Sequence, residues 1–428
     1  MKNKGKNGQG GAGRTRPRRL LLCLDGVPYE IIEAARARGL FDAFNAPSCL
    51  LSPFPTLTNV ALAAMFKASA PMGYESLYFD RAERVVRGGV SKYIGRRTPD
   101  KVPSSYMDEL DYQEPLPFEF LIYVAPEAVW RADMRRFHQR FRAAPQDRDY
   151  FAFLKGTDGL LHICGRERLD TALLSLDRIL TDIHATCGAE TEIVLFSDHG
   201  MNLQENRRSH LQTQLRRSGF EMTDCLDGRS RLAVASPAFG LCGYAALYCS
   251  DEETAPLVAD ALVPLEGLDF AIHRDGPSAI MVKGARGTAR IERQENGRST
   301  LYRYQQLAGD PLQLAPILRS LDAEGLLDQS GYATDDTWFA HTASHTYPDA
   351  LANLYESLHA PRVHHTADVL ASFQDGYYYG SSLFSRFVHI AATHGNALRS
   401  SSSAFLMSTH RTFAEHVRAT EARPLLKG

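Results

Sequence analysis

One layout constrains the fold more than any other feature, and it recurs at four places: an apolar run ends and an aspartate or histidine follows it. Uninterrupted apolar runs are typical of strands that are buried on both faces of a parallel sheet. Open sheets of this kind place their chemistry at the carboxyl ends of the strands. The layout therefore predicts an α/β fold with a mostly parallel central sheet and a polar site at one edge.

Carboxylates and imidazoles stand at these strand ends. The run that begins at Arg19 leads into Asp25, and residues 192–196 lead into Ser197-Asp198-His199-Gly200. Groups of this kind favour two adjacent metal sites, and zinc, manganese and iron all accept mixed oxygen and imidazole ligands. Two neighbouring cations suit phosphoryl transfer, because one activates a nucleophile while the other steadies the leaving oxygen. The candidate ligands are Asp25, Asp158, His162, Asp198, His199 and His394.

A loop at residues 54–59 precedes an alanine-rich helical stretch and supplies the candidate nucleophile. We favour the hydroxyl of Thr58, because contact with a cation lowers the pKa of a hydroxyl towards neutrality. At a helix start this hydroxyl also lies beside free backbone N–H groups, which favour a phosphate oxygen. The side-chain amide of Asn59 is a candidate donor to the transferring group.

Hydrophobic patterning predicts the other elements of the core. Leu169, Leu173, Leu176, Leu180 and Ile183 recur at intervals of four and three, which indicates an amphipathic helix with a buried stripe. The further strands are predicted at residues 118–124, 150–154, 368–373 and 404–407, and the further helices at 28–39, 60–68 and 349–358, with an arginine-rich helical stretch between the first two strands.

The pattern of predicted elements changes between residues 204 and 335, where short strands and helices follow one another without repeated motifs. We interpret this segment as a smaller α+β cap subdomain inserted over the edge of the sheet. The catalytic core then comprises residues 18–203 and 336–428, and residues 1–17 form a basic, disordered leader.

Charge and cysteine content narrow the class of protein. The 48 Lys and Arg residues against 50 Asp and Glu residues give a net charge of −2, which argues against an extended nucleic-acid surface or membrane attraction. The apolar run at residues 20–24 is too short for a signal-peptide core or a membrane span. Seven cysteines without a C-x-x-C pair favour reduced thiols in a cytoplasmic protein. The oligomeric state stays open.

Five short motifs follow one another along nearly the whole chain. They are Leu24-Asp25-Gly26, Phe54-Pro-x-x-Thr58, Asp158-x-x-x-His162, Ser197-Asp198-His199-Gly200-Met201 and Thr393-His394-Gly395. In this order and at this spacing they resemble the alkaline phosphatase superfamily, specifically its type I phosphodiesterase and nucleotide pyrophosphatase branch.

The resemblance implies an α/β/α sandwich, a variable cap that chooses the substrate, and two divalent metal ions, zinc with manganese as the alternative. It implies one metal held by Asp25, Thr58, Asp198 and His199, and another held by Asp158, His162 and His394. Thr58 would be the covalent phosphoryl acceptor. Thr56 remains the alternative nucleophile, since Asn59 then follows three positions later, as in the T-x-x-N pattern of nucleotide pyrophosphatases.

These features together predict a cytoplasmic, metal-dependent phosphohydrolase that acts on a phosphodiester or nucleotide-like pyrophosphate bond through a phosphothreonine. Its partner is a small phosphoester or nucleotide-like substrate, without membrane association. A phosphomutase, phosphotransferase or phosphomonoesterase of the same superfamily is the alternative, and a binding protein without turnover is a further one. A sulfatase is disfavoured, because no Cys/Ser-x-Pro-x-Arg segment is present.

Overall fold

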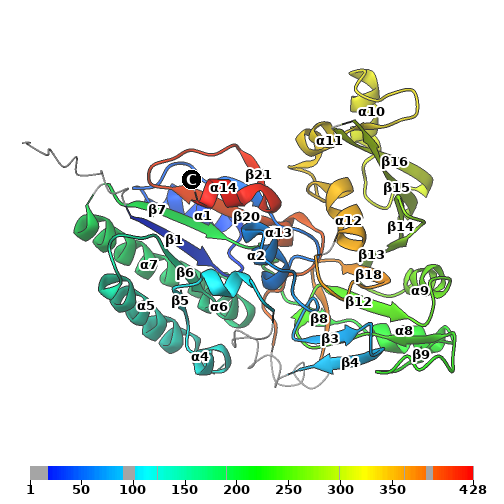
Figure 1. Cartoon of the computed structure of the whole chain (residues 1–428), viewed down its shortest axis with the longest axis horizontal. Coiled ribbons are helices and arrows are strands. Elements are labelled where there is room, and N and C mark those ends of the chain that lie inside the picture. The colour runs from blue at the N-terminus through cyan, green and yellow to red at the C-terminus, as the bar shows by residue number, and fades with distance from the viewer. Residues whose placement is uncertain are drawn as a thin grey trace, which may run out of the picture.

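The computed structural model arranges the chain in two lobes, each built around a sheet (Figure 1). It describes residues 18–89, 102–122, 124–188, 190–297, 299–360, 362–381 and 389–427. The leader predicted at residues 1–17 lies outside these ranges. Within them, no helix combines the length and the apolar character that crossing a bilayer requires.

A seven-stranded sheet forms the first lobe, in the order β21-β2-β20-β7-β1-β6-β5. Strand β20 runs antiparallel to both of its neighbours, whereas all the other pairs are parallel. The mostly parallel central sheet is therefore confirmed. Its strands are β1 (Arg19–Leu24), β2 (Ser48–Leu51), β5 (Tyr112–Gln113), β6 (Tyr150–Leu154), β7 (Glu192–Ser197), β20 (Ser403–Ser408) and β21 (His416–Arg418).

Alternate residues of β1 enter two different apolar clusters. Leu20, Leu22 and Leu24 pack with helices α1, α5 and α7, whereas Leu21 and Cys23 pack with α2 and α14. Because successive side chains of a strand point to opposite faces, helices cover both faces and the predicted α/β/α sandwich is confirmed. The helices of this lobe are α1 (Tyr29–Ala37), α2 (Thr58–Phe66), α4 (Leu116–Leu121), α5 (Pro126–Ala143), α6 (Gly156–Cys164), α7 (Arg166–Cys187), α13 (Arg399–Ser402) and α14 (Ala422–Lys427), with the short 3-10 turns η1 (Tyr106–Glu109) and η3 (Ala419–Glu421).

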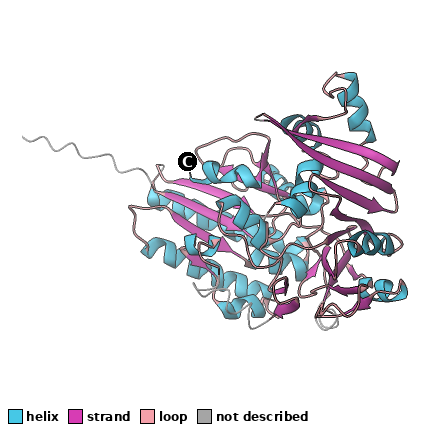
Figure 2. Cartoon of the chain, turned by 45° about the vertical axis from the view of Figure 1, so that its right-hand side comes forward, coloured by secondary structure: helices cyan, strands magenta, loops and turns pink. Residues whose placement is uncertain are grey.

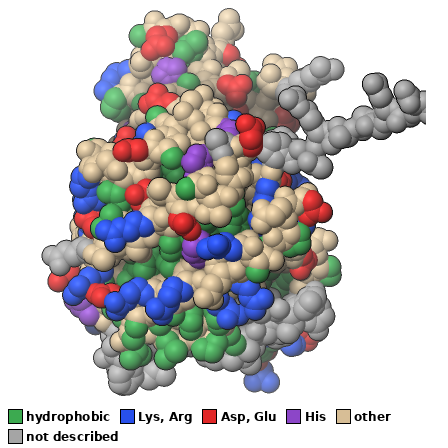
Figure 3. Space-filling view, turned by 90° about the vertical axis from the view of Figure 1, so that its left-hand side faces the viewer, with side chains coloured by type: hydrophobic (Ala, Val, Ile, Leu, Met, Phe, Trp, Pro, Cys, Tyr) green, Lys and Arg blue, Asp and Glu red, His purple; other side chains and the backbone are tan. Residues whose placement is uncertain are grey.

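Helix α5 is the arginine-rich stretch that the sequence indicated. It buries Trp130 and Phe137 against the sheet and exposes Arg131 and Arg135. Figure 3 shows Lys and Arg side chains gathered at this end of the molecule. The strand predicted at residues 118–124 is wrong, because this segment lies mainly in the short helix α4. A short apolar run fits a buried helix as well as a strand, so its pattern alone does not distinguish them.

A nine-stranded sheet forms the second lobe, in the order β17-β16-β15-β14-β13-β18-β12-β10-β9, and stands apart from the first (Figure 2). Most of its strands come from residues 204–335, but β18 (Val369–Phe373) lies between β13 and β12. The prediction that residues 368–373 return to the core sheet is therefore wrong. Helix α12 (Ala350–His359) also packs on this second sheet, and the division of the chain into core and cap stays a prediction.

The remaining elements belong mainly to this second lobe. Its other strands are β9 (Glu221–Met222), β10 (Ala233–Ala235), β12 (Tyr244–Cys249), β13 (Leu268–Arg274), β14 (Ala279–Gly284), β15 (Gly287–Asn296), β16 (Ser299–Gly309) and β17 (Ala333–Thr334). Its other helices are α8 (Leu211–Arg217), α9 (Thr254–Leu262), α10 (Ala315–Ala323) and α11 (Asp335–Thr342). Two small sheets join them: the hairpin of β3 (Leu77–Asp80) and β4 (Val85–Gly88), and a three-stranded sheet of β11 (Leu241–Cys242), β19 (Tyr377–Gly380) and β8 (Arg207–Arg208).

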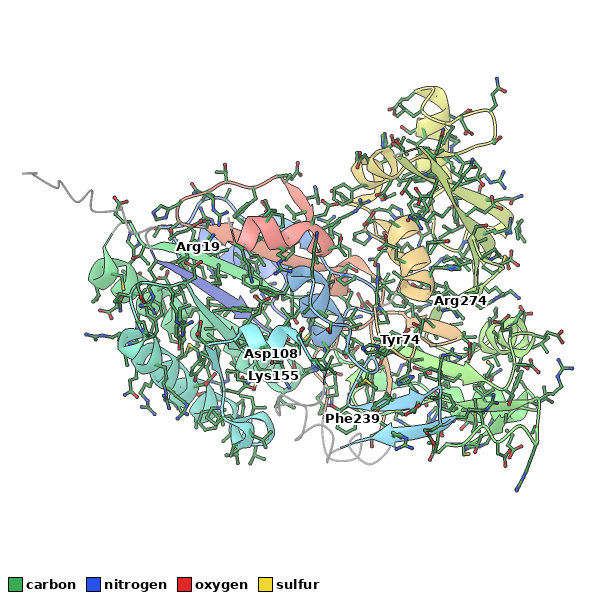
Figure 4. The ribbon with its side chains drawn as sticks, in the orientation of Figure 1. Arg19, Tyr74, Asp108, Lys155, Phe239 and Arg274 are labelled. Carbon is green, nitrogen blue, oxygen red and sulfur yellow. The ribbon has the colours of Figure 1, made fainter. Side chains whose placement is uncertain are left out.

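A carboxyl group in the loop after α2, that of Glu75, forms hydrogen bonds with residues of the second lobe. Glu75 accepts hydrogen bonds from the Gly240 backbone N–H at 2.7 Å and from the Tyr244 hydroxyl at 3.1 Å. Figure 4 shows Tyr74 and Phe239 in the region where the lobes meet. Burial raises the pKa of Glu75 to about 7, although both hydrogen bonds favour its charged form.

Replacing Glu75 with glutamine is expected to stabilise the protein at pH 8 but not at pH 5. Folding raises the pKa of this carboxyl above its ordinary value, so its favourable contribution is complete below about pH 4.5 and is lost as the pH rises through 7. Glutamine stays neutral: its Oε1 can accept from the Gly240 N–H, and its Nε2 can donate to the Tyr244 hydroxyl oxygen. We expect the free energy of unfolding in urea to rise by about 1–3 kcal/mol at pH 8. The exposed Glu83→Gln variant is the control, and an equal effect of E75Q at both pH values would contradict the expectation.

Candidate metal centre

The carboxyl ends of three adjacent strands meet at one place in the core sheet. Leu24 of β1 lies opposite Leu154 of β6 and opposite Ser197 of β7, so the residues that follow these strands are brought together. Asp25 directly follows β1, and Asp198 directly follows β7. Both carboxylates are fully buried. The site therefore arises from strand register, at the edge of the sheet where these buried apolar strands end.

Asp158 and His162 reach the same place from helix α6, which begins shortly after β6 ends. Both residues are helical and lie four residues apart on one helix face, rather than in a turn directly after the strand. Both are more than nine-tenths buried. His394 comes from the loop that precedes α13, and it is buried to the same extent.

The Thr58 side chain lies within this group of residues. Its hydroxyl donates a hydrogen bond to Asp25 Oδ1 at 3.2 Å, and Nε2 of His199 lies 3.3 Å from the same hydroxyl. His199 Nε2 is also 3.4 Å from Asp25 Oδ1 and 3.4 Å from Asp198 Oδ2. The structure thus brings together the four residues that the family resemblance assigned to one metal.

The other three candidate ligands gather around Asp158. Its Oδ1 atom is 3.2 Å from His162 Nε2 and 3.6 Å from His394 Nε2. The His394 ring stacks on the His199 ring with centroids 4.0 Å apart, so the two groups adjoin. Ligand atoms of Asp25, Asp198 and His199 all lie within 4.8 Å of one another, and so do those of Asp158, His199 and His394. His199 therefore lies between the two clusters.

Hydrogen bonds on the far side of each imidazole orient the three histidines. Nδ1 of His162 contacts the Ala392 carbonyl oxygen at 2.7 Å, and Nδ1 of His394 contacts the Thr56 carbonyl oxygen at 2.8 Å. Nδ1 of His199 contacts the Gly200 carbonyl oxygen at 2.9 Å. A carbonyl accepts only from a protonated nitrogen, so in the neutral ring the lone pair lies on Nε2 and faces the carboxylates. This is the arrangement by which proteins orient imidazole ligands towards a metal.

The residues present fit a pair of cations. Three buried carboxylate oxygens, Asp25 Oδ2, Asp158 Oδ1 and Asp198 Oδ2, have no hydrogen-bond partner within the described part of the chain. A buried carboxylate oxygen without a donor is costly unless a cation or a proton lies against it. Carboxylates and imidazole nitrogens facing one another supply the hard and borderline ligands that divalent zinc and manganese accept.

The pKa shifts in the cluster also indicate that its carboxylates require positive charge nearby. Burial raises the pKa of Asp25 to about 8, and the neighbouring Asp198 and Asp158 carboxylates add to this rise. Burial opposes a charge on His199, yet the carboxylates of Asp198 and Asp25 raise the pKa of its imidazole to about 10. Burial and the adjacent His199 together lower the pKa of His394 well below its ordinary value. Without cations the cluster must therefore retain protons that bound metals would displace.

Thr56 and Thr58 occupy different surroundings. The Thr56 hydroxyl is fully buried, donates to the Asn396 carbonyl oxygen at 3.0 Å and accepts from the Gly395 N–H at 2.9 Å. Thr58 is the first residue of α2, and its hydroxyl does not cap the helix, because Leu57 occupies the N-cap position. The geometry favours Thr58 over Thr56 as the group that meets a substrate.

Two residues to which sequence reasoning gave no role hold the turns of the site. The Ser197 hydroxyl donates to the His199 carbonyl oxygen at 2.9 Å, and the Thr157 hydroxyl donates to the Asp25 carbonyl oxygen at 2.6 Å. Both hydroxyls fix the backbone next to a candidate ligand. Ser197 stands inside a recognised motif, whereas no pattern in the sequence distinguishes Thr157 from an ordinary helix-start threonine.

The turn at Gly200 tolerates no side chain, so Gly200→Ala is expected to be strongly destabilising. A Cβ atom there would lie 2.4 Å from the Ser400 carbonyl oxygen and 2.7 Å from that of Ser403, and backbone cannot give way as a flexible side chain does. We expect a loss of about 2–4 kcal/mol in urea unfolding, with reduced metal content because Gly200 anchors His199. Gly243→Ala, whose nearest contact is 3.3 Å, is the control. Wild-type stability of G200A would refute this account.

Comparison with known proteins places the fold. No protein-family model and no curated protein matches the chain. A phosphonoacetate hydrolase from Sinorhizobium meliloti matches with a TM-score of 0.53 at 11% identity, covering 96% of this chain and 95% of that one. Murine ectonucleotide pyrophosphatase/phosphodiesterase 5 matches with a TM-score of 0.50 at 12% identity, covering 96% and 94%.

Both of these proteins belong to the alkaline phosphatase superfamily. At such low identity they show the fold alone, and at that level the resemblance seen in the sequence motifs is confirmed. The chain thus shares its fold with a phosphonoacetate hydrolase and an ectonucleotide pyrophosphatase/phosphodiesterase, and the clusters around Asp25 and Asp158 contain groups able to bind metal.

Proposed function

We propose that this chain is a metal-dependent phosphodiesterase or nucleotide pyrophosphatase that works through a covalent phosphothreonine at Thr58. One observation carries the proposal: the Thr58 hydroxyl donates to Asp25 Oδ1 at 3.2 Å inside a buried cluster in which three carboxylate oxygens have no hydrogen-bond partner among the described residues. The fold shared with a nucleotide pyrophosphatase/phosphodiesterase supports it.

Two divalent cations would occupy the cluster, zinc in the first instance and manganese as the alternative. The first would be held by Asp25, Thr58, Asp198 and His199, and the second by Asp158, His162 and His394. When bound, the cations would lower the pKa of the attacking hydroxyl and offset charge on the phosphoryl oxygens. In the protein itself, the three Nδ1–carbonyl contacts keep the imidazole lone pairs directed at this place.

The reaction proposed for these residues has two displacements. Thr58 Oγ1 attacks phosphorus in line, the bond from phosphorus to the leaving oxygen breaks, and a phosphothreonine forms. Asp25 Oδ1 accepts the hydrogen bond of the hydroxyl and is the nearest group to take its proton. The leaving oxygen takes up the proton that Asp25 accepted. Water then attacks the phosphothreonine from the opposite face, the bond from phosphorus to Thr58 Oγ1 breaks, and one water proton passes to Oγ1, which releases the product and restores Thr58. The free N–H groups at the start of α2 and the amide of Asn59 would stabilise the phosphoryl oxygens.

The proposed substrate is a small phosphoester or nucleotide-like molecule, and we propose a cytoplasmic setting. All seven cysteines are unbonded thiols, which supports a reducing compartment. The second lobe would act as the cap that selects the substrate, although part of it comes from residues after 335.

A substrate panel tests the proposal. Protein loaded with zinc or manganese is assayed against bis-p-nitrophenyl phosphate, the p-nitrophenyl ester of thymidine monophosphate, p-nitrophenyl phosphate and phosphonoacetate, with metal content measured by elemental analysis. We expect hydrolysis of the two diesters with two metal ions per chain. Preference for the monoester or for phosphonoacetate would overturn the substrate class, and slow phosphate release with transfer to an added alcohol would favour a phosphotransferase. No turnover of any substrate by fully loaded protein would refute an enzymatic role.

A further inference from the structure

The side-chain amide of Asn59 accepts a hydrogen bond from a buried tyrosine. Asn59 is the second residue of α2, directly after Thr58. The Tyr106 hydroxyl donates a hydrogen bond to Asn59 Oδ1 at 2.8 Å. Among the residues that the structure describes, Asn59 Nδ2 has no hydrogen-bond acceptor, and the side chain is only partly buried. The amide therefore has an occupied oxygen and two available N–H donors.

Packing fixes the tyrosine that makes this contact. Tyr106 is only 4% exposed, and it belongs to the apolar cluster that contains Leu62 and Met65 of α2. It begins the turn η1, whose start is capped by the Ser105 side chain through the Met107 N–H at 3.3 Å. A ring buried against the same helix that carries Asn59 places its hydroxyl at a defined position beside the amide. The contact is thus built into the core and does not depend on a mobile surface side chain.

The orientation of an amide decides whether it attracts or repels a phosphate. Its N–H₂ end donates to phosphoryl oxygens, whereas its carbonyl end is an acceptor that would face negative charge. The Tyr106 hydroxyl binds the carbonyl oxygen, so the amide is fixed with its N–H₂ end available to an anion. Donors aligned in advance cost no reorganisation when charge develops, which is why they contribute to rate.

We propose that Tyr106 is a positioning residue for phosphoryl transfer: it orients the Asn59 amide so that the N–H₂ group faces a phosphoryl group held beside Thr58. This inference rests on the proposed function at Thr58 and adds to it a residue that touches neither substrate nor metal. Sequence reasoning had no means of finding it, because Tyr106 lies in a segment with weak periodicity, 47 residues from its partner.

A double-mutant cycle tests the inference. Tyr106→Phe keeps the ring and removes the hydroxyl, so we expect kcat for a diester to fall about 3–10-fold, with KM and metal content nearly unchanged. Asn59→Ala is expected to cost more, about 10–100-fold, because the donor itself is lost. In the Asn59→Ala background, Tyr106→Phe should have no further effect, since there is no amide left to orient. Additive losses in the double variant would overturn the inference.

A binding measurement separates this inference from the proposed function. The affinity of metal-loaded protein for inorganic phosphate is measured by calorimetry for all four proteins of the cycle. Weaker binding in Tyr106→Phe that vanishes in the Asn59→Ala background supports the positioning role even if the protein hydrolyses no ester. Equal phosphate affinity in wild type and Tyr106→Phe, together with equal turnover where turnover is present, refutes the positioning role alone.

The matched control is Tyr112→Phe. Tyr112 is also a buried tyrosine, but it belongs to a different apolar cluster from Tyr106, and its hydroxyl donates to Asp133. Loss of this hydroxyl should lower the stability of the protein without altering turnover or phosphate affinity of the folded fraction. A similar loss of turnover in both variants would show that Tyr106 acts through stability, and would overturn the inference.

Discussion

Replacing Thr58 with alanine is expected to reduce hydrolysis of a phosphodiester by about a thousandfold or more, while metal content stays near the wild-type value. The substitution removes the atom that would form the bond to phosphorus, and no other hydroxyl among the described residues contacts both the Asp25 carboxylate and the His199 ring. The carboxylate and imidazole ligands remain, so cations should still bind. Steady-state kinetics and elemental analysis on the same preparation measure both quantities.

Thr56→Ala is the internal control for this result. The Thr56 hydroxyl links the Gly395 N–H to the Asn396 carbonyl oxygen, so its loss leaves two buried backbone groups without a partner. We expect a loss of about 1–3 kcal/mol in the free energy of unfolding, with turnover retained by the folded fraction. If Thr56→Ala loses turnover and Thr58→Ala keeps it, the nucleophile has been assigned to the wrong threonine.

Removing the cations is expected to abolish turnover and to lower the melting temperature, and the second effect should grow with pH. Folding raises the pKa of both Asp25 and His199. A raised pKa contributes stability that is complete below the unfolded value and is lost as the pH rises through the folded value. For Asp25 this loss extends from about pH 4 to about 8, and for His199 from about 6.5 to about 10. Chelated protein should therefore melt lower at pH 9 than at pH 6.

Asp25→Asn separates the stability of the cluster from its function. Asparagine cannot ionise. In urea unfolding at pH 8, the free energy of unfolding of metal-free D25N should therefore exceed that of metal-free wild type by roughly 1–4 kcal/mol. The same variant should lose metal affinity and turnover, because one ligand is gone. The exposed carboxylate Asp227 provides the control variant Asp227→Asn. If chelation left the melting temperature of the wild-type protein unchanged at both pH 6 and pH 9, the assignment of a metal centre would be contradicted.

Much of the site could be predicted because it depends on strand ends. Uninterrupted apolar runs at residues 20–24, 150–154 and 193–196 form strands β1, β6 and β7, and their register brings the following residues to one place. Parallel pairing requires only that such strands be adjacent, so the convergence of Asp25 and Asp198 follows from pattern and topology rather than from local propensity.

Predictions failed where the local sequence pattern does not determine which strand, helix or side chain a segment contacts. The apolar run at residues 118–124 fits a helix or a strand, and packing against α5 and α6 accompanies a helix there. Residues 368–373 form the predicted strand but pair with β12 and β13, because an apolar strand carries no mark of the sheet it joins. Tyr106 lies far from Asn59 in sequence, and no periodicity connects them.

The central place of β18 in the second sheet has a consequence for dissecting the protein. Residues 204–335 do not form a module that can be excised, because the fragment would lack the strand that pairs β12 with β13. Both β12 and β13 would then present unpaired hydrogen-bonding edges, and the rest of the protein would keep β18 without its two neighbouring strands. The second lobe cannot be transplanted by exchanging one continuous segment, so chimaeras must exchange residues 204–335 together with the segment that contains β18.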